Sequence, residues 1–233
     1  MESGDARVVE INDERDPLAV PTLELIRRAI HDVQPVEDLL SELEERRRGL
    51  PSGAEHHLVA LVENGEPLAA VAGLYLPTVN AGFITYLAVH EKARGRLLGR
   101  QLRARLVDAF RADARAAGRE LAWTVGEVRR ESPWLRTLVS HGEAIPFAFS
   151  YFHPWQTRRS EGKYVLYREP VGDPRAELPA GEVLGLVYAI WRRAYRIRFP
   201  LQSEVFCYMI EQMEGVETVG VDPAFAADAE AVE

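Results

Sequence analysis

Residues 86–102, YLAVHEKARGRLLGRQL, predict a strand, a basic turn and the start of a helix. The helix is predicted over residues 97–117, because apolar residues recur at every fourth position until Gly118 ends the pattern. These positions are Leu98, Leu102, Leu106, Phe110 and Ala114. A helix start presents unpaired backbone N–H groups and the positive end of the helix dipole, and both favour phosphate oxygens. The stretch therefore predicts a site for a phosphate-bearing ligand.

The composition of the turn supports this prediction. Gly95 and Gly99 allow a ligand to approach the backbone closely, and Arg94, Arg96 and Arg100 add cationic donors. The alternative is an ordinary basic turn followed by a solvated helix face. The sequence contains no Gly-Lys-Ser/Thr run of the Walker type, which argues against a phosphate-hydrolysing enzyme.

The segments around this stretch predict an α/β (α+β) fold with a mixed central sheet and flanking helices. Before the turn, we expect an antiparallel meander that follows a first strand and two helices. After it, residues 121–125 form a strand, so a parallel strand-helix-strand crossover lies mid-chain and marks a ligand crevice. The predicted strands are residues 7–11, 57–62, 68–76, 82–89, 121–125, 145–152 and 163–168. The predicted helices are residues 18–30, 35–48, 97–117, 132–142 and 182–196.

The composition argues against several classes of function. The chain has 233 residues, of which 47% are hydrophobic, and a net charge of −8 that disfavours general nucleic-acid binding. No apolar run approaches the roughly 20 residues needed to cross a membrane. The acidic N-terminal residues do not resemble a secretory signal, so we expect a cytoplasmic protein. We expect no metal site, because His56 and His57 are adjacent on a strand and point to opposite faces.

The turn resembles the acyl-CoA motif of the GNAT superfamily of N-acetyltransferases. That motif has Arg or Gln, two residues, Gly, one residue, then Gly or Ala, after a strand similar to Leu-Ala-Val-His. The corresponding residues here are Arg94, Gly95, Arg96, Leu97, Leu98 and Gly99. Leu97 departs from the motif, which has Gly there, and its side chain either narrows the pyrophosphate pocket or points harmlessly into the core. The order of strands and helices also resembles the superfamily from Arg7 to about Arg168.

The resemblance implies the GNAT fold and acetyl-CoA as the acyl donor, with no metal. The backbone of Leu87, Ala88 and Val89 would pair with the pantetheine amides, as an added strand does. The N–H groups of residues 95–99 would hold the pyrophosphate, with the arginine side chains near the nucleotide phosphates. The implied acceptor is a primary amine of a small molecule or peptide, and no nucleic acid or membrane is an expected partner.

The catalytic residues usual in the superfamily are missing. An alkyl ammonium has a pKa of about 10, so a base must remove a proton before the amine can attack. Residues 82–86 contain no carboxylate, and Leu138 stands near the usual tyrosine position. We expect Glu127 to replace the base; the alternative is a surface carboxylate paired with Arg129 or Arg130.

Aromatic residues near the end of the predicted sheet are the candidate proton donors. Tyr151 and His153 would supply a proton or shape the acceptor pocket. The alternative is a packed aromatic strand end, and Tyr86 is a second donor candidate. The other aromatic residues, Tyr195 included, fit helix cores.

We expect three regions along the chain. Residues 1–170 form the acyltransferase domain, residues 171–216 a helical extension packed on it, and residues 217–233 a mobile acidic tail. The arrangement resembles uncharacterised bacterial GNAT proteins with a C-terminal extension, which would cover the acceptor cleft, complete a homodimer interface or enlarge the core. The alternative function is a non-catalytic GNAT-fold module that binds acyl-CoA or another protein, favoured by Leu97 and the missing base and tyrosine.

Overall fold

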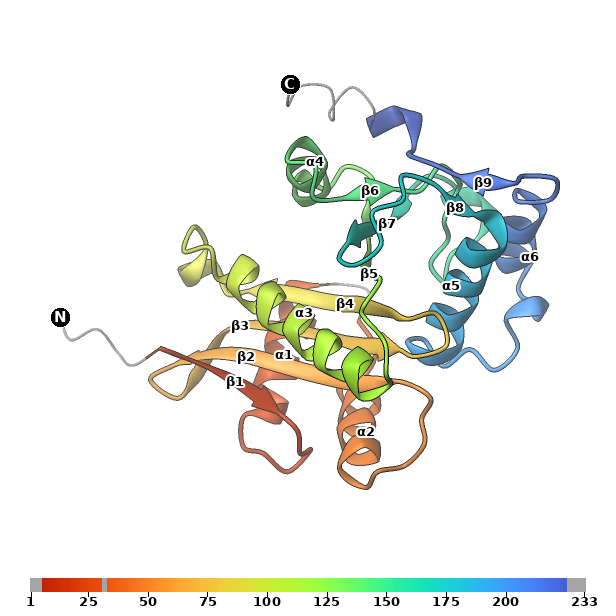
Figure 1. Ribbon diagram of the computed structural model, residues 1–233. Coiled ribbons are helices and arrows are strands. Elements are labelled where there is room, and N and C mark those ends of the chain that lie inside the picture. The colour runs from red at the N-terminus through yellow and green to blue at the C-terminus, as the bar shows by residue number, and fades with distance from the viewer. Residues whose placement is uncertain (1–5, 31–32, 226–233) are drawn as a thin grey trace. The chain divides into compact units, whose positions relative to one another are not determined.

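The computed structural model describes residues 6–30 and 33–225 (Figure 1). The chain divides into two compact units. Unit one comprises Met1–Tyr75 and Ile84–Arg119, and unit two comprises Leu76–Phe83 and Glu120–Glu233. The strands of the main sheet follow the order β1-β2-β3-β4-β5-β7-β6, which is the predicted mixed sheet.

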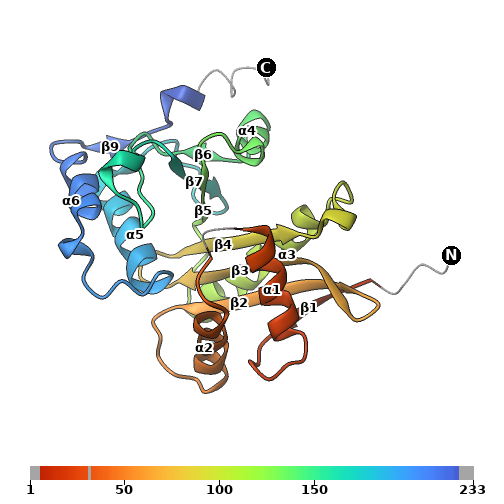
Figure 2. The same ribbon diagram turned by 180° about the vertical axis from the view of Figure 1, so that it is seen from behind.

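Unit one is a layer of strands between helices. Its strands are β1 (Arg7–Ile11), β2 (Glu55–Glu63) and most of β3 (Glu66–Leu76) and β4 (Ala81–Val89). The helices α1 (Ala19–Ala29) and α2 (Val36–Arg47) lie on one face, and α3 (Leu98–Ala116) lies on the other (Figures 1 and 2). Asn64 and Gly65, with φ of 55° and 82°, make the tight turn of the predicted β2–β3 hairpin.

Apolar spacing explains why these helices form and where they pack. In α3, all five residues of the predicted stripe are buried, so that prediction is confirmed. On the opposite face, Leu23 and Ile26 of α1 join Leu39 and Leu43 of α2 in one core with the strands. Burial of such side chains contributes about 1.5–3 kcal/mol each.

Unit two is built on β5 (Trp123–Arg129), β7 (Tyr164–Pro170) and the two-residue β6 (Ile145–Pro146). β5 and β7 are antiparallel, with Val125 opposite Arg168. Leu135 and Val139 of α4 (Pro133–Ser140) pack against Tyr167 of β7. The remaining elements are α5 (Ala180–Arg193), α6 (Glu204–Glu211), and the pair β8 (Leu178–Pro179) and β9 (Thr218–Val219). Short 3-10 helices are η1 (Glu91–Ala93), η2 (Arg158–Ser160), η3 (Pro200–Gln202) and η4 (Pro223–Phe225).

Two predicted strands of unit two differ from the structure. β5 extends to Arg129, so Glu127 lies within the strand and not just past it. Residues 145–152 form no continuous strand beyond β6. Instead, Phe147 bridges to Val221 and Tyr151 bridges to Tyr164, so two residues of this segment pair with different parts of the chain.

The C-terminal segment also differs from the predicted tail. Its described part, residues 217–225, forms β9 and η4, with Val219 paired to Leu178. Phe225 is 1% exposed and packs in the core beside α4. The acidic, alanine-rich composition predicted no packing here, because only a few apolar residues of the segment are buried. Residues 226–233 of the predicted tail lie outside the described residues.

No helix within residues 6–30 and 33–225 has the length and apolar character needed to cross a membrane.

Candidate active site

The predicted phosphate-binding turn lies in unit one, between β4 and α3. β4 ends at Val89, η1 follows, and α3 begins at Leu98. The side chain of His90 caps η1, since its Nδ1 accepts a hydrogen bond of 3.2 Å from the backbone N–H of Lys92. Positive φ angles at Gly95 (80°) and Leu97 (57°) then turn the chain into the helix.

Leu97, at the position where the motif has glycine, takes the left-handed backbone conformation. A leucine in this left-handed region costs about 1–2 kcal/mol, whereas glycine adopts it freely. The residue is 75% exposed, so its side chain does not point into the core, and that alternative from the sequence is wrong. A glycine at this position would meet no conformational penalty.

The residue before α3 does not cap the helix with its side chain. Leu97 makes no side-chain cap, so the N–H groups of the first helical turn have no side-chain acceptor at the cap. A Cβ added at Gly99 would lie 3.6 Å from Leu87 and 3.7 Å from Val89, which is ordinary contact. Gly99 therefore faces β4, and the helix packs closely on the strand whose backbone the resemblance assigns to pantetheine.

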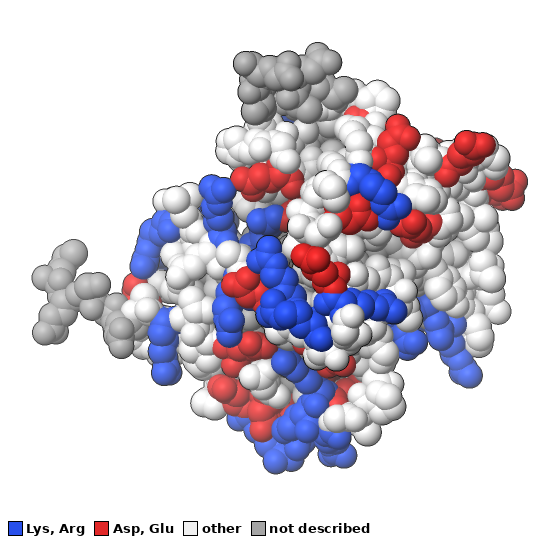
Figure 3. All heavy atoms as spheres, viewed as in Figure 1, with Lys and Arg blue, Asp and Glu red and all other residues white. Residues whose placement is uncertain are grey.

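The arginines of the turn are not equivalent. Arg96 pairs with Glu63 at 2.8 Å, and this contact lowers the pKa of the carboxyl. Arg94 lines a cavity of unit one. Over α3, Lys and Arg side chains alternate with Asp and Glu, so the helix surface is not uniformly basic (Figure 3).

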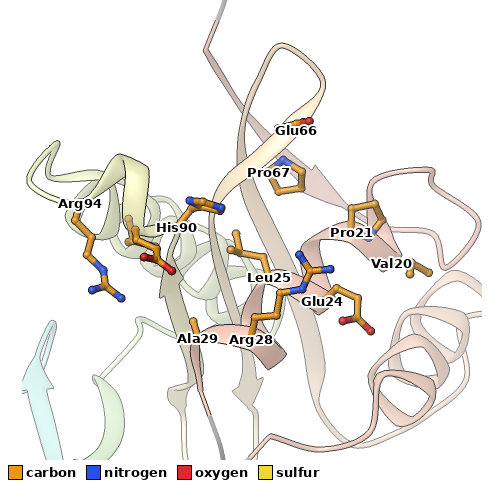
Figure 4. A pocket seen from close by; sticks show the side chains of 12 residues that line it. Val20, Pro21, Glu24, Leu25, Arg28, Ala29, Glu66, Pro67, His90 and Arg94 are labelled. Carbon is orange, nitrogen blue, oxygen red and sulfur yellow. The ribbon is translucent and has the colours of Figure 1, made fainter.

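A cavity of about 550 Å³ opens beside the turn within unit one (Figure 4). In Figure 4, Arg94 and His90 lie on one side of it, and Arg28 and Glu24 of α1 lie on the other. The remaining lining residues are Val20, Pro21, Leu25, Ala29, Glu66, Pro67, Val89 and Glu91. Its volume suits a ligand group of small-molecule size, and its charged lining residues are of both signs.

The predicted catalytic residues come together in unit two. Glu127 of β5 accepts hydrogen bonds from the hydroxyls of Tyr151 and Tyr195, one on each carboxylate oxygen. His153 Nε2 lies 3.4 Å from Glu127 Oε1. The Glu127 side chain is only 6% exposed, while Arg130 pairs with Asp222 at 2.8 Å. The alternative of a surface carboxylate paired with Arg130 is therefore wrong.

Tyr151 is held protonated in this cluster. Burial raises its pKa well above the usual value, and the charge and hydrogen bond of Glu127 raise it further. Because its hydroxyl donates to Glu127, its proton is directed at that carboxylate. His153 has its ring centroid 4.7 Å from that of Trp155 and 4.6 Å from that of Tyr195.

The sequence did not reveal Tyr195 as part of this cluster. It is 5% exposed, as a core residue would be, but its hydroxyl binds Glu127. It follows α5 by two positions and is far from Glu127 along the chain, so local periodicity gave no signal. Tyr86, the second donor candidate, accepts a hydrogen bond of 3.2 Å from the backbone N–H of Gln34 in unit one.

The two histidines of β2 point to opposite faces, as predicted. His57 Nδ1 lies 2.8 Å from Glu10, and Nε2 lies 2.6 Å from Asp113 of α3. Burial lowers the pKa of His57, but the hydrogen bonds to Asp113 and Glu10 outweigh it, so the net pKa is above 6.5. His56 instead pairs with Glu42 of α2 at 3.0 Å. In the described part of the chain, no three His, Cys, Asp or Glu residues are grouped to hold a metal ion.

Comparisons with known proteins bear on both units. Residues 23–132 match the acetyltransferase (GNAT) family. The fold is similar to the ribosomal-protein-S18-alanine N-acetyltransferase of Escherichia coli, with TM-score 0.51 and 15% identity over 73% of this chain and 99% of that one. A putative GNAT-family acetyltransferase of Bacteroides thetaiotaomicron gives TM-score 0.57 and 13% identity over 81% and 98% of the two chains.

The NatC complex bound to Gag peptide and CoA gives TM-score 0.51 and 14% identity over 72% of this chain and 99% of that one. No curated protein sequence matches the chain. At these identities, the similar structures show a shared fold.

Proposed function

We propose that the chain, whose residues 23–132 match the acetyltransferase (GNAT) family, moves an acetyl group from acetyl-CoA to a primary amine. The observation that carries the proposal is the β4–α3 turn, in which Leu97 has the left-handed backbone conformation that glycine adopts freely. The acceptor amine belongs to a small molecule or a peptide.

The cofactor is proposed to bind along unit one. The backbone of Leu87, Ala88 and Val89 pairs with the pantetheine amides, and the open N–H groups of the α3 start hold the pyrophosphate. Arg94, Arg96 and Arg100 lie near the nucleotide phosphates, and Arg96 also pairs with Glu63. A similar structure, the NatC complex, was solved with CoA, which supports this choice of cofactor.

We assign the base to Glu127. The amine nitrogen attacks the thioester carbonyl carbon, the carbon–sulfur bond breaks, CoA leaves as the thiolate, and the nitrogen releases its second proton to solvent. Glu127 takes the proton that the acceptor ammonium must lose, and His153 is the proposed donor to the thiolate. Tyr151 and Tyr195 orient the carboxylate through their hydrogen bonds.

The second candidate function is a GNAT-fold module that binds acyl-CoA without turnover. The hydrogen bonds of Glu127 favour this module. Both carboxylate oxygens already accept a tyrosine hydroxyl, which leaves Glu127 less able to accept a proton from an amine. The module is also favoured by Leu138, which is 3% exposed at the position where the superfamily has its tyrosine.

Release of free CoA in the presence of a panel of primary amines distinguishes the two functions. We expect turnover, with kcat falling about 100-fold or more in Glu127→Gln while the affinity for acetyl-CoA stays unchanged. Glu131→Gln is the matched control, since Glu131 is an exposed carboxylate just beyond β5. Full activity of Glu127→Gln would refute the base; acetyl-CoA binding without turnover on any amine would favour the module.

A further inference from the structure

Glu127 is a buried carboxylate that lacks a fixed cation. Its side chain is 6% exposed, and within residues 6–30 and 33–225 no Lys or Arg forms an ion pair with it. Its partners are two tyrosine hydroxyls, together with His153 Nε2 at 3.4 Å. Buried carboxylates are normally paired with a cation, because removing an ionised group from water is costly. Apart from His153, which is cationic only when protonated, the cluster holds no cation, and a cationic ligand would supply one.

An exposed aromatic side chain lies beside this carboxylate cluster. Trp155 is 59% exposed, although its neighbours His153 and Tyr195 are almost fully buried. Its ring centroid is 5.4 Å from that of Tyr195, at an interplanar angle of 84°, and 4.7 Å from that of His153, at 46°. Part of the indole ring is thus free to bind another group.

Aromatic faces and a carboxylate together select one kind of ligand. The negative face of an indole or phenol ring attracts an ammonium group, and the attraction grows when water is excluded. The same rings pack against aliphatic carbon. An anionic ligand would be repelled by Glu127, and a neutral one would leave its charge unpaired.

We propose that Trp155, Tyr195 and Glu127 form the acceptor-recognition site, and that it binds a primary alkylammonium group. The aliphatic chain lies on Trp155, and the ammonium faces Glu127. This inference rests on the proposed function in one respect: the bound ammonium is the group that becomes acetylated. Trp155 is a specificity-determining residue, and Tyr195 is a positioning residue that holds the carboxylate.

Binding of simple probes tests the site without turnover. Calorimetric titration of the full chain uses n-butylammonium chloride, with 1-butanol and sodium butyrate as neutral and anionic counterparts. We expect only n-butylammonium to bind, and we expect Trp155→Ala to weaken it about 3- to 30-fold. Phe199→Ala is the matched control, because Phe199 is 55% exposed in the same unit and should leave binding unchanged.

A second variant separates the positioning role of Tyr195 from ligand binding. Tyr195→Phe keeps the ring and removes the hydroxyl, so we expect a change in kcat and its pH profile greater than the change in n-butylammonium affinity. Equal binding of 1-butanol and n-butylammonium, or unchanged affinity in Trp155→Ala, would overturn the proposal. If amines are acetylated but Trp155→Ala leaves their KM unchanged, the site is wrong while the acetyltransferase stands. If n-butylammonium binds as expected but no amine is acetylated, the site stands and the proposed function fails.

Discussion

Replacing Leu97 by glycine measures the strain in the turn that begins α3. Leu97 has a φ of 57° and is 75% exposed. Glycine would relieve about 1–2 kcal/mol of left-handed strain but lose about 0.5–1 kcal/mol in conformational freedom. Since about a quarter of the side chain's surface is buried, removing it costs less than about 1 kcal/mol. The free energy of unfolding should therefore change by less than about 1 kcal/mol in Leu97→Gly.

A second leucine provides the control. Leu201 in η3 is 65% exposed and is not among the residues of positive φ. Leu201→Gly relieves no strain and should destabilise the protein by about 1–1.5 kcal/mol. The difference between the two substitutions, about 1–2 kcal/mol, is the strain at Leu97, and in a chain of this length it corresponds to roughly 2–8 °C in Tm.

Urea unfolding and melting of both variants give this difference directly, and calorimetry with acetyl-CoA adds a functional measure. Leu97→Gly should bind acetyl-CoA at least as well as the unaltered protein, because the backbone donors stay in place. Leu97→Val should bind more weakly, since β-branched residues rarely adopt the left-handed region. Equal losses of stability in Leu97→Gly and Leu201→Gly would refute the left-handed turn and the binding geometry inferred from it.

The packing of β5 and the charges of unit one give two further predictions. Gly126→Ala should destabilise the protein by about 1–3 kcal/mol, because a Cβ there would lie 2.5 Å from Tyr167 Oη. Gly181→Ala, whose Cβ would meet nothing within 4 Å, should instead stabilise it by about 0.5 kcal/mol, and equal urea midpoints for the two variants would contradict the contact. The hydrogen bond from His57 and nearby charges lower the pKa of Glu10 to about 2, against desolvation, so its stabilisation is present above pH 4.5 and lost as pH falls toward 2. The raised pKa of His57 contributes stability that is complete below pH 6.5 and lost as pH rises through that raised pKa, so the urea midpoint should fall above pH 6.5 in the unaltered protein and less steeply in His57→Gln.

The sequence predicted the elements whose patterns are local. The four-residue stripe of α3 and the Asn64-Gly65 turn depend on residues close together in the chain, and both are confirmed. The motif indicated the turn at residues 94–99. Leu97 departs from the motif, but its backbone still takes the left-handed conformation that glycine adopts freely. The apolar residues predicted a strand that ends at residue 125. In the structure β5 continues to Arg129, because Glu127 and its neighbours pair with β7.

Long-range pairing explains what the sequence did not show. Tyr195 reaches Glu127 across 68 positions, and no spacing rule connects the end of an apolar helix to a strand so far away. Phe147 and Tyr151 lie in one predicted strand, but each bridges to a different segment. At the C-terminus, Phe225 is buried by contacts with α4, which the acidic composition around it does not suggest.

Calorimetric titration of acetyl-CoA into the intact protein, beside Gly99→Glu and Gly181→Glu, tests the cofactor site most directly. Both glycines are the second residue of a helix, α3 and α5 respectively, so the two changes place the same negative charge in comparable first turns. Melting without ligand establishes that each variant is folded. Acetyl-CoA should bind the unaltered protein and Gly181→Glu equally, and Gly99→Glu at least about tenfold more weakly, because its carboxylate repels the pyrophosphate from the α3 donors. Equal affinity in folded Gly99→Glu, or no binding to the unaltered protein, would contradict a coenzyme A site at the start of α3.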